Sequence, residues 1–363
     1  MPATKITSPD HPALAELCQA LADHAQEVDR TGNWPAQQLQ LCAEYGVFEW
    51  FLDPAWGGQA WDQESVVRGY LALSGACLTT TFIITQYTGA CRRIANSENQ
   101  DLKERLLPDL AQGKLFATVG ISHLTTSRRH LSTPVLRAER KEGGFLLDGF
   151  SPWVTGAAYA DSVMIGATLM DGDQATDEQL LVALPTNLSG VSAPEPAQLV
   201  GVSASATGEL RLDQVFVEDQ WLLAGPTENI MSKGASSPGG YETSTLALGL
   251  ADAAINFLAT EAAKRADLGA PLAALRQEHD DVSKTLFAVV HGTPDCSTET
   301  LRQQANSLAL RSAQAALAAA KGTGYVLGHP AGRWCREALF FLVWSCPQPV
   351  LSANLCELAG ITE

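Results

Sequence analysis

The stretch from Gly322 to Pro347 contains the residue types best suited to holding a ligand. A long alanine-rich run ends at Gly322-Thr-Gly324, and the next segment carries two arginines three residues apart, Arg333 and Arg336. That segment ends in an apolar and aromatic run, which Pro347 stops. A helix that ends at glycines leaves backbone groups free and adds no side-chain bulk, so a ligand can approach the main chain closely. The alternative is a helix-loop-helix corner in an all-α domain.

The composition argues against several classes of protein. The chain has 363 residues, of which 46% are hydrophobic and 18% charged, as in an ordinary globular protein. Its net charge of −16 argues against a nucleic-acid partner, because phosphate binding needs a basic surface. No apolar run reaches the roughly eighteen residues of a membrane span. The first residues lack the layout of a signal peptide, so we expect a cytoplasmic protein.

The cysteines and histidines give no support to a metal site. The eight cysteines form no CxxC pair, and the seven histidines form no HExxH motif or close pair. Most of the cysteines lie in apolar helical context, which predicts reduced thiols in the core rather than disulfides.

The hydrophobic periodicity changes twice along the chain. Residues 12–113 have the spacing of helices, and residues 64–98 are long helical material with few charges. From 116 to 216, short runs of alternating apolar residues are separated by turn residues, which is typical of strands in a sandwich or barrel. Strands in an unbroken series argue against a doubly wound sheet.

After Gly240 the helical pattern returns and continues to the end of the chain. We expect helices at 246–266, 272–290, 301–320 and 334–344, the third of them capped by Ser297. The order of elements therefore predicts an α+β protein with three domains. They are an N-terminal all-α domain at 1–114, a β domain at 115–228 and a C-terminal helical bundle at 229–363.

Several motifs, in this order along the chain, resemble those of the acyl-CoA dehydrogenase family. They are Trp56-Gly-Gly58, Trp153-Val-Thr155, Lys264-Arg265 with Leu268-Gly, Gly322-Thr-Gly324-Tyr and Arg336-Glu-Ala. Each is weak alone, but together they cover nearly the whole length. The resemblance implies the family fold, bound FAD and an acyl thioester substrate, with hydride transfer to the flavin from the substrate's CH–CH group.

The resemblance also assigns residues to the cofactor. Trp153 would shield one face of the flavin ring, and Thr155 would offer its hydroxyl and backbone N–H to the ring's edge. Arg265 would pair with the diphosphate in a neighbouring subunit, and Gly322 and Gly324 would lie against the adenine half. Thr125 keeps one residue of the family's Thr-Glu-Pro motif. Contacts across subunits imply a homodimer or homotetramer, and an electron-transfer flavoprotein is the implied electron acceptor.

The catalytic base departs from the family pattern. The family's commonest base is a glutamate after the Arg-Asp-Ala signature, and Ser345 occupies that position here. A serine cannot act as a base without a partner that takes its proton. Some family members keep the base on the first helix of the C-terminal domain, which points to Glu242. The alternative role for Glu242 is a helix N-terminal carboxylate that interacts with the helix dipole.

Other departures lie near the expected cofactor site. Basic residues at 127–130 replace the family's Gly-Ser-Asp, and Lys321 replaces a glycine. Three functions follow from these features. The first is an FAD-dependent acyl-thioester dehydrogenase. The second is a flavin monooxygenase or oxidase on the same fold, and the third is a catalytically inactive family member that has lost the base.

Overall fold

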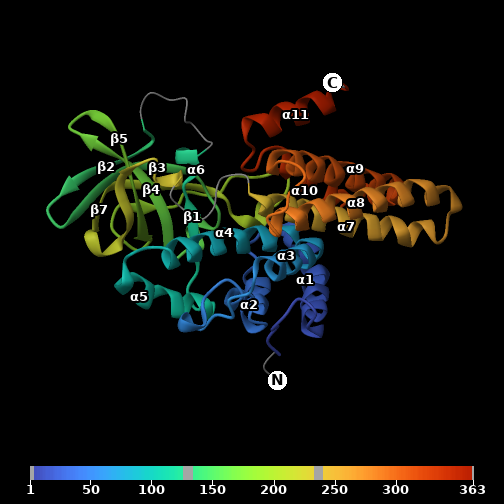
Figure 1. Cartoon of the computed structure of the whole chain (residues 1–363), viewed down its shortest axis with the longest axis horizontal. Helices are drawn as coiled ribbons and strands as arrows, with labels where there is room; N and C mark the ends of the chain where they lie inside the picture. Colours follow the sequence, from blue (N-terminus) through green and yellow to red (C-terminus); the bar gives the residue numbers. More distant parts are fainter. Residues whose placement is uncertain (1–3, 126–133, 233–239, 362–363) are drawn as a thin grey trace.

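The computed structural model describes residues 4–125, 134–232 and 240–361. Helices of the N-terminal part lie against both a central β domain and a C-terminal group of long helices (Figure 1). This arrangement confirms the predicted α+β fold class. The division of the chain at residues 114 and 228 stays a prediction.

The N-terminal part is helical, as the periodicity predicts. Its helices are α1 (Pro12–Thr31), α2 (Ala36–Glu44), α3 (Gln63–Ala76), α4 (Leu78–Ala95) and α5 (Gln100–Ala111). Polar side chains cap three of them: the backbone N–H of Ala13 donates to His11 (3.2 Å), that of Ser65 to Asp62 (2.7 Å) and that of Leu102 to Asn99 (3.1 Å). The long helical material at 64–98 is interrupted at Cys77, whose extended backbone lets α4 leave in a new direction.

The β domain is one continuous hydrogen-bonded sheet. Its strands are β1 (Ala117–Gly120), β2 (Leu136–Lys141), β3 (Gly144–Val154), β4 (Ser162–Asp171), β5 (Gln174–Pro185), β6 (Val191–Ser192), β7 (Gly208–Glu218) and β8 (Leu222–Glu228). They run in the order β6-β7-β3-β2-β4-β5-β8, and β1 pairs in parallel with β4. Alternate residues of these strands form a core of their own, which includes Phe145, Leu147 and Val163.

The C-terminal part is again helical. Its helices are α7 (Tyr241–Ala262), α8 (Gly269–Val290), α9 (Thr298–Gly324), α10 (Pro330–Leu339) and α11 (Gln348–Leu358). Ser297 caps α9 as predicted, accepting from the backbone N–H of Thr300 at 3.1 Å. The helix predicted at 334–344 instead begins at Pro330, because His329 caps it and proline suits a first helical turn. It ends at Leu339 and continues as a short 3-10 helix, η8 (Phe340–Leu342).

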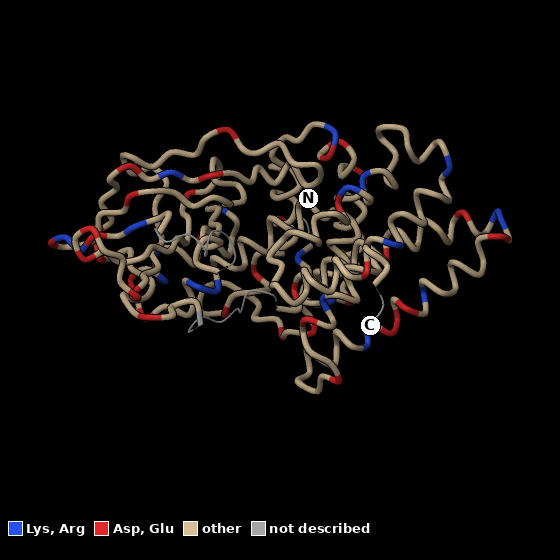
Figure 2. The backbone as a smooth tube through the Cα atoms, turned by 90° about the horizontal axis from the view of Figure 1, so that it is seen from above, with Lys and Arg blue, Asp and Glu red and all other residues tan. Residues whose placement is uncertain are grey.

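Charges are spread along the whole length of the molecule, with acidic and basic residues interspersed (Figure 2). Of the helices in the described ranges, none combines the length and apolarity that a bilayer crossing requires. All eight cysteines are free thiols, and Cys42, Cys77 and Cys91 are buried.

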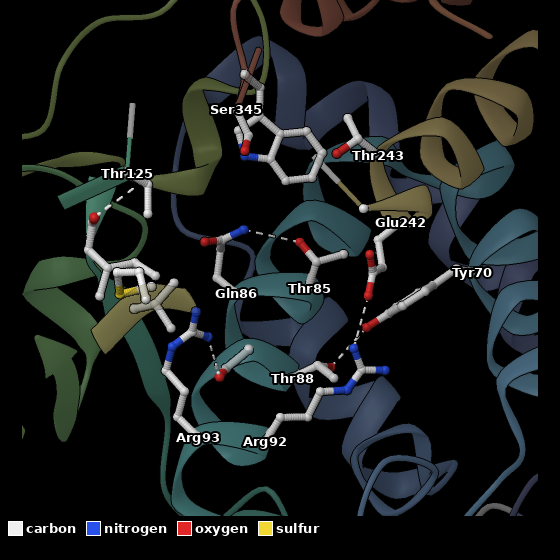
Figure 3. Close-up of a pocket in the computed structure, with 16 residues that line it drawn as sticks. Tyr70, Thr85, Gln86, Thr88, Arg92, Arg93, Thr125, Glu242, Thr243 and Ser345 are labelled. Atoms are coloured by element: carbon white, nitrogen blue, oxygen red, sulfur yellow. Dashed lines mark hydrogen bonds and ion pairs between the residues drawn. The ribbon is translucent and has the colours of Figure 1, made fainter. Parts of the chain in front are cut away.

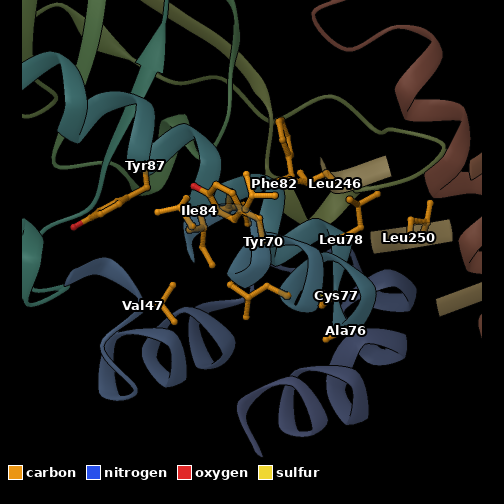
Figure 4. Close-up of a cluster of buried hydrophobic side chains, with 14 of the residues drawn as sticks. Val47, Tyr70, Ala76, Cys77, Leu78, Phe82, Ile84, Tyr87, Leu246 and Leu250 are labelled. Carbon is orange, nitrogen blue, oxygen red and sulfur yellow. The ribbon is translucent and has the colours of Figure 1, made fainter. Parts of the chain in front are cut away.

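Helix α4 is buried between the other elements. Figure 4 shows Leu78, Phe82 and Ile84 of α4 among side chains of neighbouring helices, including Tyr70 of α3 and Leu246 of α7. Each of these five residues is at most 4% exposed. Full burial of a large apolar side chain contributes about 1.5–3 kcal/mol. The hydrophobic effect therefore fixes α4 at the centre of the fold.

Helices α3 and α7 touch backbone to backbone at Gly249. A methyl group at this position would lie 1.9 Å from Ser74 Oγ and 2.5 Å from the Leu71 carbonyl oxygen. Ser74 Oγ is itself held by a hydrogen bond to the Leu71 carbonyl at 3.2 Å. Only glycine fits here without moving one helix away from the other.

We expect Gly249→Ala to destabilise the protein by about 1–3 kcal/mol, because an added methyl group overpacks this contact. Urea unfolding measures the change. The matched control is Gly269→Ala, where nothing lies within 4 Å of the added carbon. The control should unfold at or slightly above the wild-type midpoint, and equal losses in both variants would contradict the packing argument.

Candidate functional site

Two adjoining cavities lie where α4, the β domain and the segment after α10 meet. The larger has a volume of about 680 Å³ and the smaller about 170 Å³. They share six lining residues: Gln86, Val119, Ile121, Thr125, Trp344 and Ser345. The larger volume is in the range of small-molecule and cofactor sites.

Trp153 and Thr155 both line the larger cavity, at the end of β3. The pairing of β3 with β7 shifts register between Ser151 and Val154, and this irregularity turns Trp153 outward. Its side chain is 49% exposed, although its neighbour Val154 is fully buried. A large flat aromatic face is therefore left open at the cavity wall.

Three hydroxyl groups form a chain behind this wall. Thr155 Oγ1 lies 3.1 Å from Thr207 Oγ1, which lies 2.8 Å from Ser205 Oγ. Three hydroxyls have three protons, and the two bonds between them use only two. If Ser205 donates to Thr207 and Thr207 to Thr155, the Thr155 proton is free to donate into the cavity.

The smaller cavity contains an ion pair between distant parts of the chain. Arg92, in the last turn of α4, donates from Nη1 to Oε1 of Glu242, in the first turn of α7, at 2.9 Å. Figure 3 shows Glu242 turned toward Arg92, with Tyr70 beside them. Burial raises the pKa of Tyr70, so its hydroxyl stays neutral and donates to Thr88 Oγ1 at 2.9 Å. In the described lining of both cavities, Glu242 is the only carboxylate.

Ser345 lies at the junction of the two cavities, in a left-handed backbone conformation (φ 46°). Such a conformation is strained for a residue other than glycine. Within the described part of the chain its hydroxyl has no hydrogen-bond partner. The segment is held from behind by the buried Arg302, which donates from Nη2 to the Trp344 carbonyl at 2.6 Å. Ser345 thus has a fixed place at the cavity, and none of the described residues accepts a hydrogen bond from its hydroxyl.

The remaining predicted cofactor residues lie elsewhere. Arg265 follows α7 and donates from Nη2 to the Ala319 carbonyl of α9 at 2.8 Å. Gly322 and Gly324 end the same helix, after a non-helical residue at Lys321 (φ 56°, ψ −149°). The structure therefore brings Arg265 close to the glycine segment, but places both away from the two cavities.

Thr125 ends the short helix α6 (Ser122–Thr125) and lines both cavities. Its hydroxyl donates to the Ser122 carbonyl at 3.2 Å. The basic residues at 127–130 lie outside the described residues.

Sequence reasoning missed several residues of the site. Ser122 and Thr207 line the larger cavity, and Arg92 and Arg93 line the smaller. Ser122 comes two residues after the end of the buried strand β1, and this position is a signal that could have identified it. In the sequence, the two arginines look like ordinary cations in the last turn of a helix. Cations interact favourably with the helix dipole at that end, so their positions gave no separate signal of a site.

The sequence and fold both have relatives. Residues 13–114 match the family described as "Acyl-CoA dehydrogenase, N-terminal domain". The chain is 25% identical to a probable acyl-CoA dehydrogenase, YngJ, of Bacillus subtilis over 340 residues, which is 88% of each chain. The chain is therefore similar in sequence to acyl-CoA dehydrogenases over most of its length.

Solved structures of this fold superpose over almost the full chain. Butyryl-CoA dehydrogenase from Megasphaera elsdenii matches with a TM-score of 0.82 and 17% identity, covering 95% of this chain and 97% of that one. The prolyl acyl carrier protein oxidase AnaB matches with a TM-score of 0.77 and 17% identity, covering 96% and 99%. At these identities the likeness establishes the fold.

Charged residues anchor α10 at the cavity. Arg336 lines the larger cavity and forms an ion pair with Asp29 of α1. Glu337 is 1% exposed, 3.8 Å from Arg333, and its Oε2 has no hydrogen-bond partner among the described residues. Burial raises the pKa of Glu337 to about 7, against the opposing effect of Arg333.

This raised pKa predicts a dependence of stability on pH. Between the ordinary glutamate value and about 7, the folded chain holds a proton on Glu337 that the unfolded chain has lost. The free energy of unfolding should therefore fall as pH rises through this window, by up to about 1.4 kcal/mol per pH unit. Glu337→Gln should flatten that slope in urea unfolding, and Glu16→Gln, at an exposed position, should not. Equal slopes in all three proteins would contradict the assignment.

Proposed function

We propose that this chain is an FAD-dependent oxidoreductase of the acyl-CoA dehydrogenase type, acting on the CH–CH group of an acyl thioester. The observation that supports it best is the pair of cavities. One offers an open aromatic face and a hydroxyl wall, and the other contains a single described carboxylate. Members of this family typically use FAD.

The residues of the larger cavity suit a flavin. Trp153 presents a half-exposed ring that a second flat ring can cover, and the hydroxyl chain can supply a donor at Thr155. Ser122 Oγ is buried without a hydrogen-bond partner among the described residues and lines the same cavity. A buried hydroxyl of this kind is stabilised when a ligand provides its partner. Bound flavin would supply hydride acceptance.

The chain's own groups would position the substrate and move its proton. The apolar side chains of Phe82, Phe340 and Trp344 exclude water from the cavity wall, which strengthens polar interactions inside it. We assign the base to Glu242, which would take the proton from the carbon beside the thioester carbonyl at a carboxylate oxygen. Arg92 holds that carboxylate in place. Ser345 has no described partner and is the weaker candidate.

A flavin oxidase or monooxygenase is the second candidate. The lack of a carboxylate at Ser345 and the engagement of Glu242 by Arg92 favour it, because such enzymes need no base at this position. The similar AnaB structure is that of an oxidase of a prolyl acyl carrier protein. The acyl group of the substrate would accordingly be carried either by CoA or by a carrier protein.

We also propose that the chain works as a homodimer or homotetramer, with Arg265, Gly322 and Gly324 meeting a cofactor held by a neighbouring subunit. After Gly324, Tyr325 is 86% exposed and Leu327 is 88% exposed. Exposed apolar side chains in a row suit contact with another protein surface. An electron-transfer flavoprotein is the proposed electron acceptor.

The first test is the colour of the protein. Purified protein, or protein supplied with FAD, should absorb at about 450 nm, as oxidised flavin does. A colourless protein that takes up no FAD would exclude both enzyme functions and leave only the third, a catalytically inactive family member. Anaerobic bleaching by acyl-CoAs supports the dehydrogenase. Flavin that no thioester bleaches, but that reoxidises rapidly in air after chemical reduction, supports the oxidase or monooxygenase.

The second test addresses the base. Glu242→Gln keeps the shape and the hydrogen bond to Arg92 but cannot take a proton, so thioester-driven bleaching should slow by about 10²–10⁴-fold with flavin retained. Stopped-flow absorbance measures the rate. Glu261→Gln on the same helix is the matched control and should bleach at the wild-type rate. Unchanged bleaching in Glu242→Gln together with a large loss in Ser345→Ala would reverse the assignment.

A further inference from the structure

Arg93 is a cation on the wall of the smaller cavity, and it has no acidic partner among the residues that the structure describes. Its neighbour Arg92 is paired with Glu242, whereas Arg93 donates from Nη1 only to the Gly89 carbonyl of its own helix, at 2.8 Å. Within residues 4–125, 134–232 and 240–361, no carboxylate lies within ion-pair distance of its guanidinium. Figure 3 shows Arg93 on the side of the cavity away from Glu242.

The cavity therefore has an excess of positive charge. Its charged lining residues are Arg92, Arg93 and Glu242, which sum to one positive charge. The segments 126–133 and 233–239 contain no Asp or Glu in the sequence. This local sign is opposite to the formal net charge of −16 of the whole chain. A cavity of one sign concentrates ligands of the other.

Holding this guanidinium away from water is unfavourable without an anion. Burial, and then repulsion from Arg92, lowers the pKa of Arg93 to about 10, so the group is still charged at neutral pH. A guanidinium has five N–H donors, and the bond to Gly89 uses one. The remaining donors suit a carboxylate, which a guanidinium binds through two parallel hydrogen bonds.

We propose that Arg93 binds a second, free carboxylate on the acyl group, so that the preferred substrates are thioesters of dicarboxylic acids. This inference rests on the proposed function of the site. The volume of about 170 Å³ suits a short carboxylate-bearing chain rather than a nucleotide. The other source of negative charge on such a substrate is the phosphate groups of the CoA carrier, which the test must separate from the acyl carboxylate.

The test compares thioesters that differ only in this group. Glutaryl-CoA and pentanoyl-CoA have acyl chains of equal length, and only the first has a terminal carboxylate. Isothermal titration of the flavin-loaded protein with each gives the two dissociation constants. We expect wild type to bind glutaryl-CoA at least about tenfold more tightly, since a charge-assisted hydrogen bond contributes about 1.5–3 kcal/mol.

Variants then locate the preference. Arg93→Met removes the charge and should weaken the binding of glutaryl-CoA by about 10–100-fold. The same variant should change the dissociation constant of pentanoyl-CoA by less than about threefold. Arg93→Lys keeps the charge without the fork of donors and should retain part of the preference. Arg276→Met is the matched control, because it removes an exposed arginine of α8 and should change neither constant.

Three results would overturn the proposal. Equal affinity of wild type for the two thioesters does so without any variant, even where Arg93→Met fails to fold. Equal weakening of both ligands in Arg93→Met assigns Arg93 to the CoA phosphates. If Arg93→Met weakens the binding of neither thioester, Arg93 is a cation that stabilises the end of α4. A protein that binds no flavin or no acyl-CoA contradicts the proposed function itself, which is a separate outcome.

Discussion

The close contact of α7 with α3 at Gly249 is the constraint on which the site depends. Because no side chain separates the two backbones there, the position of α7 relative to the N-terminal helices has little freedom. Glu242 lies two turns before Gly249 on the same helix, and α4 packs against that helix. The pairing of Glu242 with Arg92, across 150 residues of sequence, is a consequence of that helix contact.

Helix α4 combines a structural and a chemical role along its length. Its middle is apolar and buried, so hydrophobic packing fixes the position of the helix. Its last turn places two arginines at the wall of a cavity. One arginine is neutralised by a carboxylate from another part of the fold, and the other has no acidic partner in the described part of the chain. Rigid packing in the middle of the helix therefore holds the unpaired positive charge of its last turn in a fixed position, where a ligand can bind to it.

Several unfavourable features lie at or beside residues that line the cavities. Ser345 has a strained backbone, Arg302 is a buried cation bonded to the Trp344 carbonyl, and Glu337 is a buried acid beside Arg333. Such features persist only where the surrounding structure stabilises them, and they are common at functional sites. In the described lining of the two cavities, the one carboxylate comes from α7.

The sequence alone determined the order of helices and strands and the confirmed α+β fold class, because periodicity, capping and short motifs act within a few neighbouring residues. It could not determine which residues meet across the cavity. Glu242 and Arg92, or Thr155 and Thr207, come together only because particular helix and strand faces pack, and no local pattern encodes that choice. The same holds for Arg93, whose lack of an acidic partner among the described residues is a property of its surroundings in the folded chain. Local sequence patterns determined the helices and strands, whereas long-range packing decided which charged side chains form pairs.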